Sequence, residues 1–261
     1  MNGVGFVFPL TATAVVVLMV MIWLLSLAKR DASVVDIVWG PGFVLIAAIS
    51  CAVGGGYAPR RYLLTALTTL WGLRLGLYLL WRNWGQGEDS RYQAFRRRYG
   101  DRFWLASLYI VFGLQAALMW VVSLPVQVAQ VSPVPAQLTW LDGIGALLWL
   151  IGWLFESIGD WELARFKRDP AHRGRVMDRG LWRYTRHPNY FGDALAWWGL
   201  FVIALATPYG IWTVVGPAVM TGLLVRVSGV PLLERKLTAT RPDYAAYVRR
   251  TSSFVPWFPR S

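Results

Sequence analysis

The residues whose types could do chemistry gather between Leu154 and Trp198. This stretch leaves an apolar segment through the carboxylates Glu156 and Asp160, crosses a loop rich in arginine, and re-enters apolar sequence after Asn189 and Asp193. Eight of the 26 lysine and arginine residues and both histidines lie within it. In a membrane protein, cations, acids and hydrogen-bonding side chains concentrated at one water-facing boundary are typical of a site that holds a polar ligand. The pattern therefore predicts a site for a polar, anionic ligand.

Glu156 and Asp160 are i,i+4 neighbours, which places both carboxylates on one face of a helix. Two like charges in that relation repel, so a cation or a set of hydroxyl groups should compensate them. Lys167 and the arginines that follow it would do so in a purely structural arrangement. Alternatively, the acids accept hydrogen bonds from ribose hydroxyls, as acidic residues do in dinucleotide-binding folds.

The arginine-rich loop predicts contacts with phosphate, because arginine is the preferred bidentate partner of that group. The alternative is that these cations only fix the topology of a membrane protein. A loop with that role alone would not need hydroxyl, imidazole, amide and carboxylate groups among its arginines. The cations of this rim are Arg175, Arg179, Arg183 and Arg186, and the interleaved residues are Tyr184, His187, Asn189, Tyr190 and Asp193.

Two other kinds of site are not indicated. His172 and His187 have no cysteine near them in the sequence and do not make a zinc set, so no metal is expected. The sequence contains neither a GxGxxG motif after a strand nor a Walker loop. A nucleotide would therefore be held by a site of another kind.

Composition indicates a membrane protein. Hydrophobic residues make up 56% of the chain and charged residues 15%, whereas a soluble domain has about 25% charged residues. Sixteen tryptophans suit two interfacial aromatic belts. The net charge of +12 then indicates loops that face anionic headgroups and an anionic cofactor, with no nucleic acid as partner. Cys51 is alone, so no disulfide is expected.

Seven apolar segments approach the roughly 20 residues that cross a bilayer. They lie at residues 6–28, 34–54, 62–81, 104–127, 138–157, 194–206 and 211–227, and the sixth is short. The second contains a Gly40-Pro41-Gly42 sequence that predicts a break. We therefore expect an all-α, polytopic membrane protein with seven transmembrane helices. No internal repeat divides it, so residues 1–261 are expected to form a single domain whose cofactor-binding half is roughly 140–261.

Charge predicts the orientation of these spans. Lysine and arginine cluster after the first, third, fifth and last spans, and the loop of residues 128–139 has no charge. Only Arg60 and Arg61 fall on the opposite face, and Arg74 lies within a span. By the positive-inside rule the N-terminus is outside, and the C-terminus and basic loops are cytoplasmic, in a bacterial inner membrane. Residues 88–102 and the tail of residues 241–260 mix aromatic and basic side chains and are expected along the interface.

Polar side chains inside the predicted spans are functional candidates by default. Arg74 is in the middle of the third span, with Tyr78 one turn along on the same face. Asp36 is near the start of the second span, where it is either an interfacial carboxylate, for example paired with Arg30, or a buried acid that donates a hydrogen bond or proton to a substrate. Asp36, Arg74 and Tyr78 together would form a carbonyl-binding patch. The structural alternative is a salt bridge between Asp36 and Arg74.

From about Gly152 to Gly199 the sequence resembles the C-terminal membrane domain of the steroid 5-alpha-reductase family, and most closely a bacterial branch long described as a domain of unknown function. The resemblance covers most of the chain and ends with the aromatic residues that follow Ser253. It implies a seven-helix enzyme that uses NADPH to reduce a carbon–carbon double bond conjugated to a carbonyl.

The resemblance also implies roles for individual residues. Glu156 and Asp160 match an Asn/Asp pair that faces the cofactor, with Glu in place of Asn. Lys167 matches a base on the phosphate side, and Arg175 matches a cofactor arginine. Asn189 and Asp193 match an Asn-x-x-x-Glu that faces the nicotinamide end, with Glu shortened to Asp. The predicted cofactor set is completed by Tyr184, Arg186 and His187 of the loop.

The implied catalytic residues are Asp36, Arg74 and Tyr78. Arg74 and Tyr78 align with an Arg-x-x-x-Tyr pair of the third helix. Asp36 falls on the catalytic glutamate that hydrogen-bonds the steroid carbonyl, but the Gln-Glu pair of the steroid enzymes is absent, and this departure leaves the substrate open. We expect a lipophilic small molecule as substrate, membrane lipid as surroundings and no obligate protein partner.

A second reading is drawn from residues 186–190, Arg-His-Pro-Asn-Tyr. Similar RHPxY segments occur in isoprenylcysteine and phospholipid methyltransferases, which bind S-adenosylmethionine. That cofactor has no phosphate, so the basic loop favours NADPH. A third alternative is a non-catalytic protein whose basic loops bind anionic lipid.

Overall fold

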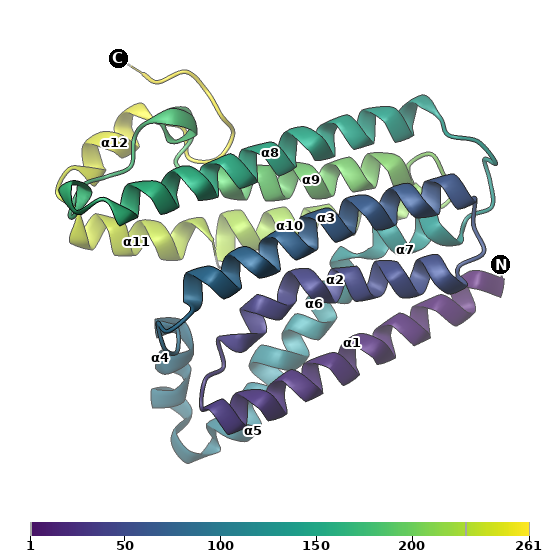
Figure 1. The fold of residues 1–261 in the computed structure, drawn as a ribbon, viewed down its shortest axis with the longest axis horizontal. Helices are drawn as coiled ribbons and strands as arrows, with labels where there is room; N and C mark the ends of the chain where they lie inside the picture. The colour runs from purple at the N-terminus through teal and green to yellow at the C-terminus, as the bar shows by residue number, and fades with distance from the viewer. Residues whose placement is uncertain (1, 228, 261) are drawn as a thin grey trace. The chain divides into compact units, whose positions relative to one another are not determined.

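The computed structural model describes residues 2–227 and 229–260, and this part of the chain is helical (Figure 1). It contains no β-strand, only an isolated bridge between Thr185 and Ser252. Six helical segments of the described residues are long and apolar enough to cross a membrane, as an integral membrane protein requires. They are Gly5–Lys29, Val34–Val53, Ala58–Asn83, Ser90–Val122, Trp140–Arg168 and Gly210–Val227.

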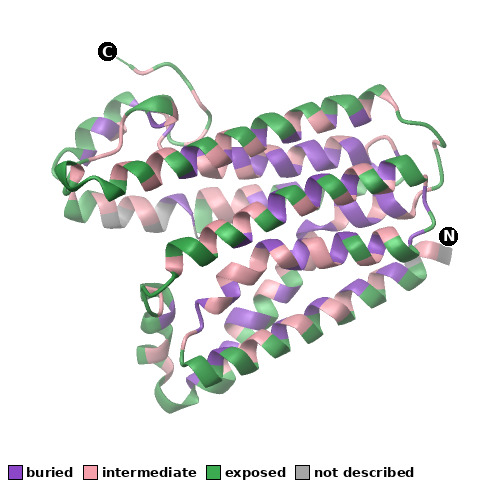
Figure 2. Ribbon diagram, in the orientation of Figure 1, coloured by how far each residue is buried: buried purple, intermediate pink, exposed green. Residues whose placement is uncertain are grey.

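The prediction of seven such helices was therefore one too many. The sixth predicted span, residues 194–206, falls in α9 (Pro188–Ala204), which begins earlier and has 17 residues. At 1.5 Å per residue, α9 is roughly 26 Å long, short of the roughly 30 Å hydrocarbon core. None of its residues is exposed (Figure 2), so α9 is buried between neighbouring elements and does not present a lipid-facing side.

The described chain divides into two compact units, Met1–Asp142 with Ala204–Gly216, and Gly143–Ile203 with Pro217–Ser261. The first unit begins with α1 (Asn2–Lys29), α2 (Val34–Val53) and α3 (Ala58–Asn83). The break predicted at Gly40-Pro41-Gly42 was wrong, because α2 is continuous through it. These residues instead allow α3 to approach: a Cβ on Gly40 would lie 2.2 Å from the carbonyl oxygen of Gly72.

The rest of the first unit runs from α4 to α7. The chain continues through α4 (Ser90–Tyr99), the short η1 (Gly100–Arg102), α5 (Phe103–Ser107), the π-helical η2 (Leu108–Gly113), α6 (Leu114–Val122) and α7 (Leu124–Val131). The unit also includes η5 (Gly210–Val214), which packs on α7. α4 accounts for most of the segment predicted to lie along the membrane interface.

The second unit contains most of α8 (Trp140–Arg168), α9, and the C-terminal helices. The latter are α10 (Val215–Gly222), η6 (Leu223–Val227), α11 (Val230–Thr240) and α12 (Tyr244–Arg250). α8 continues well beyond the apolar span predicted at residues 138–157, so its last turns carry Lys167 and Arg168 away from the apolar sequence. The arginine-rich loop between α8 and α9 contains two short 3-10 turns, η3 (Pro170–His172) and η4 (Gly180–Arg183).

A seam of glycines joins α8 to α9 and sets the register of the second unit. A Cβ on Gly145 would lie 2.6 Å from the carbonyl oxygen of Gly199, and one on Gly152 would lie 2.6 Å from that of Gly192. Small residues at this spacing let two antiparallel backbones touch. The seam brings Glu156 and Asp160 of α8 beside the first turn of α9.

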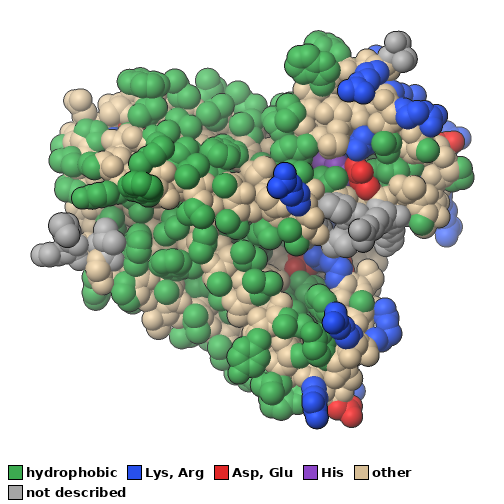
Figure 3. All heavy atoms as spheres, turned by 180° about the vertical axis from the view of Figure 1, so that it is seen from behind, with side chains coloured by type: hydrophobic (Ala, Val, Ile, Leu, Met, Phe, Trp, Pro, Cys, Tyr) green, Lys and Arg blue, Asp and Glu red, His purple; other side chains and the backbone are tan. Residues whose placement is uncertain are grey.

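The outer surfaces of the helices are apolar. Large hydrophobic side chains are exposed along α1, α3 and α8, for example Val16, Leu77 and Leu147. In the space-filling view most of the visible surface is hydrophobic (Figure 3). A soluble protein rarely exposes so large an apolar surface, whereas lipid-facing helices do.

Candidate functional site

The basic loop of the second unit is held in place by the C-terminal segment. The backbone N–H of Arg186 donates to the carbonyl of Ser252 at 2.9 Å, and that of Trp257 donates to Tyr184 at 2.9 Å. The Tyr247 hydroxyl donates to the carbonyl of Trp182. These bonds fold residues 178–187 against α12 and the tail.

The loop is also fixed to α8. The Trp182 indole donates to the carbonyl of Gly159 at 3.1 Å, and the Leu181 N–H donates to Glu162 at 3.0 Å. Gly180 allows this approach, since its φ is +56° and a Cβ there would lie 1.8 Å from the Glu162 carboxylate. The loop is thus a defined wall of the unit.

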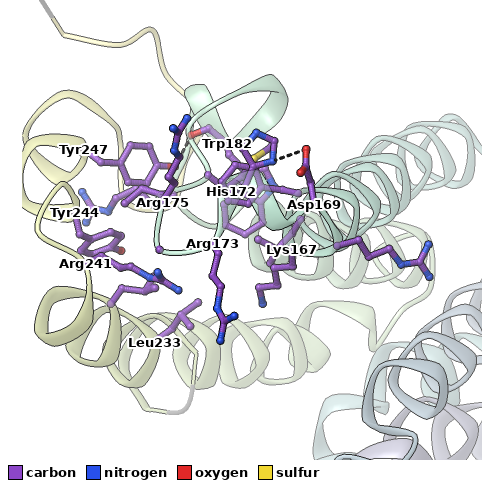
Figure 4. A pocket seen from close by; sticks show the side chains of 18 of the residues that line it. Lys167, Asp169, His172, Arg173, Arg175, Trp182, Leu233, Arg241, Tyr244 and Tyr247 are labelled. Carbon is purple, nitrogen blue, oxygen red and sulfur yellow. Dashed lines mark hydrogen bonds and ion pairs between the residues drawn. The ribbon is translucent and has the colours of Figure 1, made fainter.

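Between this loop, the end of α8, α11 and α12 lies a cavity of about 420 Å³ (Figure 4). This volume is in the range of small-molecule sites, roughly 300–1,000 Å³. Its cationic lining residues are Lys167, Arg168, Arg173, Arg175, Arg186 and Arg241, its aromatic ones Phe166, His172, Trp182, Tyr244 and Tyr247, and its acid Asp169.

Three of the cavity's arginines are not neutralised by any carboxylate of the described residues. The side chains of Arg173, Arg175 and Arg241 make no hydrogen bond or ion pair with any described residue, although the acid Asp169 also lines the cavity. Asp169 instead accepts from the Ala171 N–H and faces His172 at 3.5 Å. Cations that converge without counter-charge form a site for an anion with several charged oxygens.

Aromatic side chains supply the other surfaces of the cavity. The rings of Phe166 and His172 are stacked, with centroids 4.3 Å apart. Burial and the charge of Glu234 raise the pKa of Tyr244 to about 12, so its hydroxyl keeps its proton at neutral pH and remains a donor. The cavity therefore combines cations for phosphate with aromatic rings in its wall.

Glu234 of α11 contacts two of the predicted cofactor residues, Arg186 and His187, and fixes their side chains. Its Oε1 accepts from Arg186 Nε at 2.8 Å and lies 3.1 Å from His187 Nε2. Burial raises the pKa of Glu234, but the hydrogen bonds from His187 and Arg186 outweigh it, and the pKa lies below its ordinary value. Arg186 also donates to the carbonyls of Val248 and Thr251. It thus reaches the cavity as a fixed side chain, while His187 is fully buried behind it.

Of the nine predicted cofactor residues, Lys167, Arg175 and Arg186 line the cavity. A second pair meets at the glycine seam, where Asn189 Nδ2 donates to Asp160 Oδ1 at 3.0 Å. The Asn189 amide oxygen accepts from the N–H of Tyr190, so it orients the first turn of α9. Asp160 of α8 therefore contacts Asn189 at the start of α9, and the cofactor roles of both residues stay predictions.

The other four predicted cofactor residues lie outside the lining of the cavity. Glu156 is buried on α8 at the glycine seam, and Asp193 is half-buried on α9. Tyr184 packs its ring on Phe258 of the tail, with centroids 6.2 Å apart. His187 stacks on Tyr190, with centroids 5.5 Å apart, in addition to its contact with Glu234. Their cofactor roles stay predictions.

In the first unit Asp36 binds two residues of α4 that the sequence did not single out. Its Oδ2 accepts from Arg91 Nη2 at 2.7 Å, and its Oδ1 accepts from the Tyr92 hydroxyl at 2.7 Å. Gln115 donates to the same hydroxyl at 3.4 Å. Asp36 is thus a mostly buried carboxylate that anchors α4 to the start of α2. The predicted partner Arg30 contributes its carbonyl to Arg96 instead.

The other two predicted catalytic residues lie on α3. Arg74 is half-buried near the middle of the helix, and Tyr78 is one turn further along. The Tyr78 ring packs on Trp81 with centroids 5.9 Å apart, and the Arg82 guanidinium lies 5.7 Å from its centroid. Their assignment to a carbonyl-binding patch stays a prediction.

Comparison with known proteins identifies the family. Residues 22–251 match the family model described as "Protein of unknown function (DUF1295)". The chain belongs to the DUF1295 family. A protein of Schizosaccharomyces pombe, described as uncharacterized, is 24% identical over 263 residues, which cover 90% of this chain and 75% of that protein. No solved structure matches the chain. The DUF1295 match extends from α1 to the end of α12 and therefore includes both units.

Several residues in and beside the cavity of this DUF1295 protein were not predicted from its sequence. Phe166, His172 and Arg173 lie within the stretch Leu154–Trp198. Their closeness in sequence to Lys167 and Arg175 was a signal that could have identified them. Glu234, Arg241, Tyr244 and Tyr247 are far along the chain, in α11, α12 and the turn between them. No local sequence pattern links α11 and α12 to the basic loop, because they are separated from it by α9, η5, α10 and η6 and meet it only in the folded protein.

Proposed function

We propose that this protein is an NADPH-dependent membrane reductase that acts on a carbon–carbon double bond conjugated to a carbonyl in a steroid-like or other lipophilic substrate. The observation that carries the proposal is the cavity of the second unit, where Arg173, Arg175 and Arg241 have no carboxylate partner among the described residues. NADPH brings three phosphate groups, which supply the missing counter-charge. The reaction itself is inferred from the resemblance to the steroid 5-alpha-reductase family.

The cavity fits the phosphate-bearing part of a dinucleotide. Arg175 and Arg186 would bind phosphate oxygens through their guanidinium groups, and Lys167 would add a point charge. Arg186 is pre-organised for this by Glu234. Asp160 and Asn189, which hydrogen-bond each other, are the residues we expect to bind ribose hydroxyls and the nicotinamide end. Glu156, Tyr184, His187 and Asp193 complete that set as predicted.

When bound, NADPH supplies a hydride to the β-carbon of the enone. The product would be the saturated carbonyl compound, with the hydride on the β-carbon, a proton from water on the α-carbon, and NADP+ released. Tyr78 and Arg74 would donate hydrogen bonds to the carbonyl oxygen as negative charge develops on it, and Asp36 would do so in its protonated form, since an ionised carboxylate can only accept. Exclusion of water from an apolar bundle strengthens such a hydrogen bond.

The proposed setting is a bacterial inner membrane with the basic loops, the cavity and the C-terminus on the cytoplasmic side, where NADPH is available. This orientation, with the N-terminus outside, requires an odd number of crossings. α9 would then have to cross together with the six longer helices, which 17 residues permit only in a thin or locally deformed bilayer. The proposal includes no metal and no nucleic acid.

Ligand-dependent unfolding of the purified protein tests the proposal. At a concentration of NADPH about 100 times its Kd, the free energy of unfolding should rise by about 2.7 kcal/mol, which raises the unfolding temperature by several degrees. NADH and S-adenosylmethionine should have a smaller effect, and adenosine 2′,5′-bisphosphate should compete with NADPH. Stabilisation by S-adenosylmethionine alone would favour the methyltransferase.

Two arginines of the same loop offer a matched control. Arg175 and Arg179 are both exposed, but only Arg175 lines the cavity. Arg175→Ala should weaken NADPH binding about tenfold, because a hydrogen bond to a charged group contributes roughly 1.5–3 kcal/mol. Arg179→Ala should leave binding unchanged. Equal losses for the two variants would mean that the loop attracts NADPH only through its overall charge.

A further inference from the structure

The C-terminal segment, residues 252–260, has a fixed backbone and an exposed apolar face. The N–H groups of Trp257 and Arg260 donate to the carbonyls of Tyr184 and Arg250, at 2.9 and 2.8 Å. The Thr185 hydroxyl donates to the carbonyl of Phe254 at 2.8 Å. This ordered backbone nevertheless presents Trp257 and Phe258 outward, with exposed fractions of 70% and 77%. Large aromatic side chains held outward in this way mark an interaction surface.

Contacts within the second unit place this surface at the boundary between apolar and polar sequence. The ring of Phe254 packs on Phe191, with centroids 6.0 Å apart, and Phe191 packs on Phe155 of α8, with centroids 5.3 Å apart. Phe155 is the residue before Glu156, where the apolar part of α8 ends. The segment therefore lies at the level at which α8 leaves the hydrocarbon, the depth that tryptophan prefers in a bilayer.

Three exposed arginines lie in the tail or in the segments that its backbone contacts. Arg183, Arg249 and Arg260 are exposed, and their side chains make no hydrogen bond or ion pair with any described residue. Arg183 precedes Tyr184, whose ring contacts Phe258. By contrast, Arg250 is paired with Asp178. An aromatic face with unpaired cations at its edge complements the anionic headgroup region of a membrane.

We propose that residues 252–260 dock on an anionic lipid surface, with Trp257 and Phe258 in the interfacial layer and Arg183, Arg249 and Arg260 against lipid phosphates. This function is independent of the proposed reductase activity. Lipid, not a protein, is the occupant because the surface lies at the level where α8 leaves the apolar phase. The docked segment would hold α12, and with it Tyr244 and Tyr247, against the membrane.

Site-directed spin labelling tests the proposal, because Cys51 is the only cysteine of the chain. In a Cys51→Ala background, a label is placed at Val255→Cys, which leaves Trp257 and Phe258 intact. Leu147→Cys on the exposed side of α8 and Arg179→Cys in the basic loop provide references for lipid and water. The protein is reconstituted in nanodiscs of phosphatidylcholine with and without phosphatidylglycerol, and collisions with oxygen and with a water-soluble nickel chelate are measured.

With phosphatidylglycerol, the Val255 label should show oxygen and nickel accessibilities between those of the two references. Trp257→Ser with Phe258→Ser should shift it to the value of the Arg179 label, while an unchanged unfolding temperature shows that the fold is intact. Arg183→Gln with Arg260→Gln should abolish the dependence on phosphatidylglycerol. A Val255 label as accessible to nickel as the Arg179 label in both lipids would overturn the proposal. Equal depth in both lipids would overturn its requirement for anionic headgroups.

Discussion

The two units differ in whether their arginines have partners among the described residues. In the first unit four of the five N–H donors of the buried Arg60 guanidinium are matched: Nε and Nη2 donate to Asp142 at 2.7 and 2.9 Å, and Nη1 and Nη2 donate to the carbonyls of Pro135 and Gln137. In the second unit Arg173, Arg175 and Arg241 line a cavity and have no such partner among the described residues. Cations that converge without such partners are available to a ligand, whereas Arg60 is structural. Arg186 is an intermediate case, because Glu234 and two backbone carbonyls hold it at the cavity wall.

The Asp36 cluster resembles the first case more than the second. Arg91 binds both Asp36 and Asp89, and Arg96 binds Glu88 at 2.8 Å. The Asp36–Arg91 pair joins α4 to the start of α2, while the other two pairs lie within residues 88–96. Glu88 and Asp89 are also joined to the residues before α2 by hydrogen bonds with Ala32 and Ser33. If Asp36 is also catalytic, it has both roles, and variants must separate them. The following experiments test this contrast between the units, from the largest expected effect to the smallest.

The largest effect is expected from Arg60→Met. Removing the guanidinium leaves Asp142 buried without its partner, which should lower the free energy of unfolding by about 3–5 kcal/mol. The measurement is the denaturation midpoint of the purified protein. Arg97→Met on the exposed face of α4 is the control and should change it little. A small loss for Arg60→Met would remove the distinction between matched and available arginines.

Asp36→Asn should lower turnover about 100-fold, if the carboxyl group stabilises charge on the substrate carbonyl. NADPH binding should be unaffected, and NADPH oxidation with an enone substrate is the measurement. Asp89→Asn is a matched control, since Asp89 also accepts from Arg91 but has no predicted catalytic role. Equal losses in the two variants would show that Asp36 acts only by holding Arg91 and α4.

Arg241→Ala should weaken NADPH binding about tenfold, because an unmatched cavity cation is lost. Its unfolding temperature without ligand should not change, since no described residue forms a side-chain hydrogen bond or ion pair with Arg241 that the substitution would break. Titration calorimetry in detergent measures the first and differential scanning fluorimetry the second. Arg249→Ala, on the next helix and outside the cavity, should change neither. A large loss of stability for Arg241→Ala would place this arginine with Arg60 as a structural residue.

The smallest effect concerns acid pH. The pKa of Glu234 lies below its ordinary value in the folded protein, so its contribution to stability is present above the ordinary pKa, near 4.5. That contribution is lost as the pH falls through the folded pKa. Glu234→Gln should therefore lower stability by about 1 kcal/mol at pH 6 and by less at pH 3.

The matching carboxylate of the first unit is Glu88. Burial raises the pKa of Glu88, but hydrogen bonds from Arg96 and the Ala32 N–H lower it below its ordinary value. Glu88→Gln should follow the same pH dependence as Glu234→Gln, but only Glu234→Gln should also weaken NADPH binding, since Glu234 orders Arg186. The unfolding temperature from pH 3 to pH 6, together with NADPH titration, makes the comparison. A binding loss for Glu88→Gln would link the first unit to the cavity.

Much of the helical fold was predictable because lipid imposes a simple rule on composition. A chain that must satisfy its backbone polar groups in hydrocarbon forms helices of about 20 apolar residues, and each of the six membrane-crossing segments of the described residues overlaps a span predicted from hydropathy. The rule failed at α9, which is surrounded by protein. A helix in that position can be shorter than the roughly 20 residues that a lipid-facing span needs. The sequence Gly40-Pro41-Gly42 also misled the prediction. It is typical of a helix break, but here the small glycines let α2 and α3 pack closely.

By itself, the sequence determined the helical membrane architecture and the place where cations concentrate, because both follow from composition along the chain. Only the tertiary structure decided which cations are matched and which are open. Arg60 and Asp142 are far apart in sequence, as are Arg175 and Arg241, yet the first two meet as an ion pair and the second two line one cavity. The position of an arginine in the chain is known from the sequence, but the residue that it contacts depends on how the helices pack.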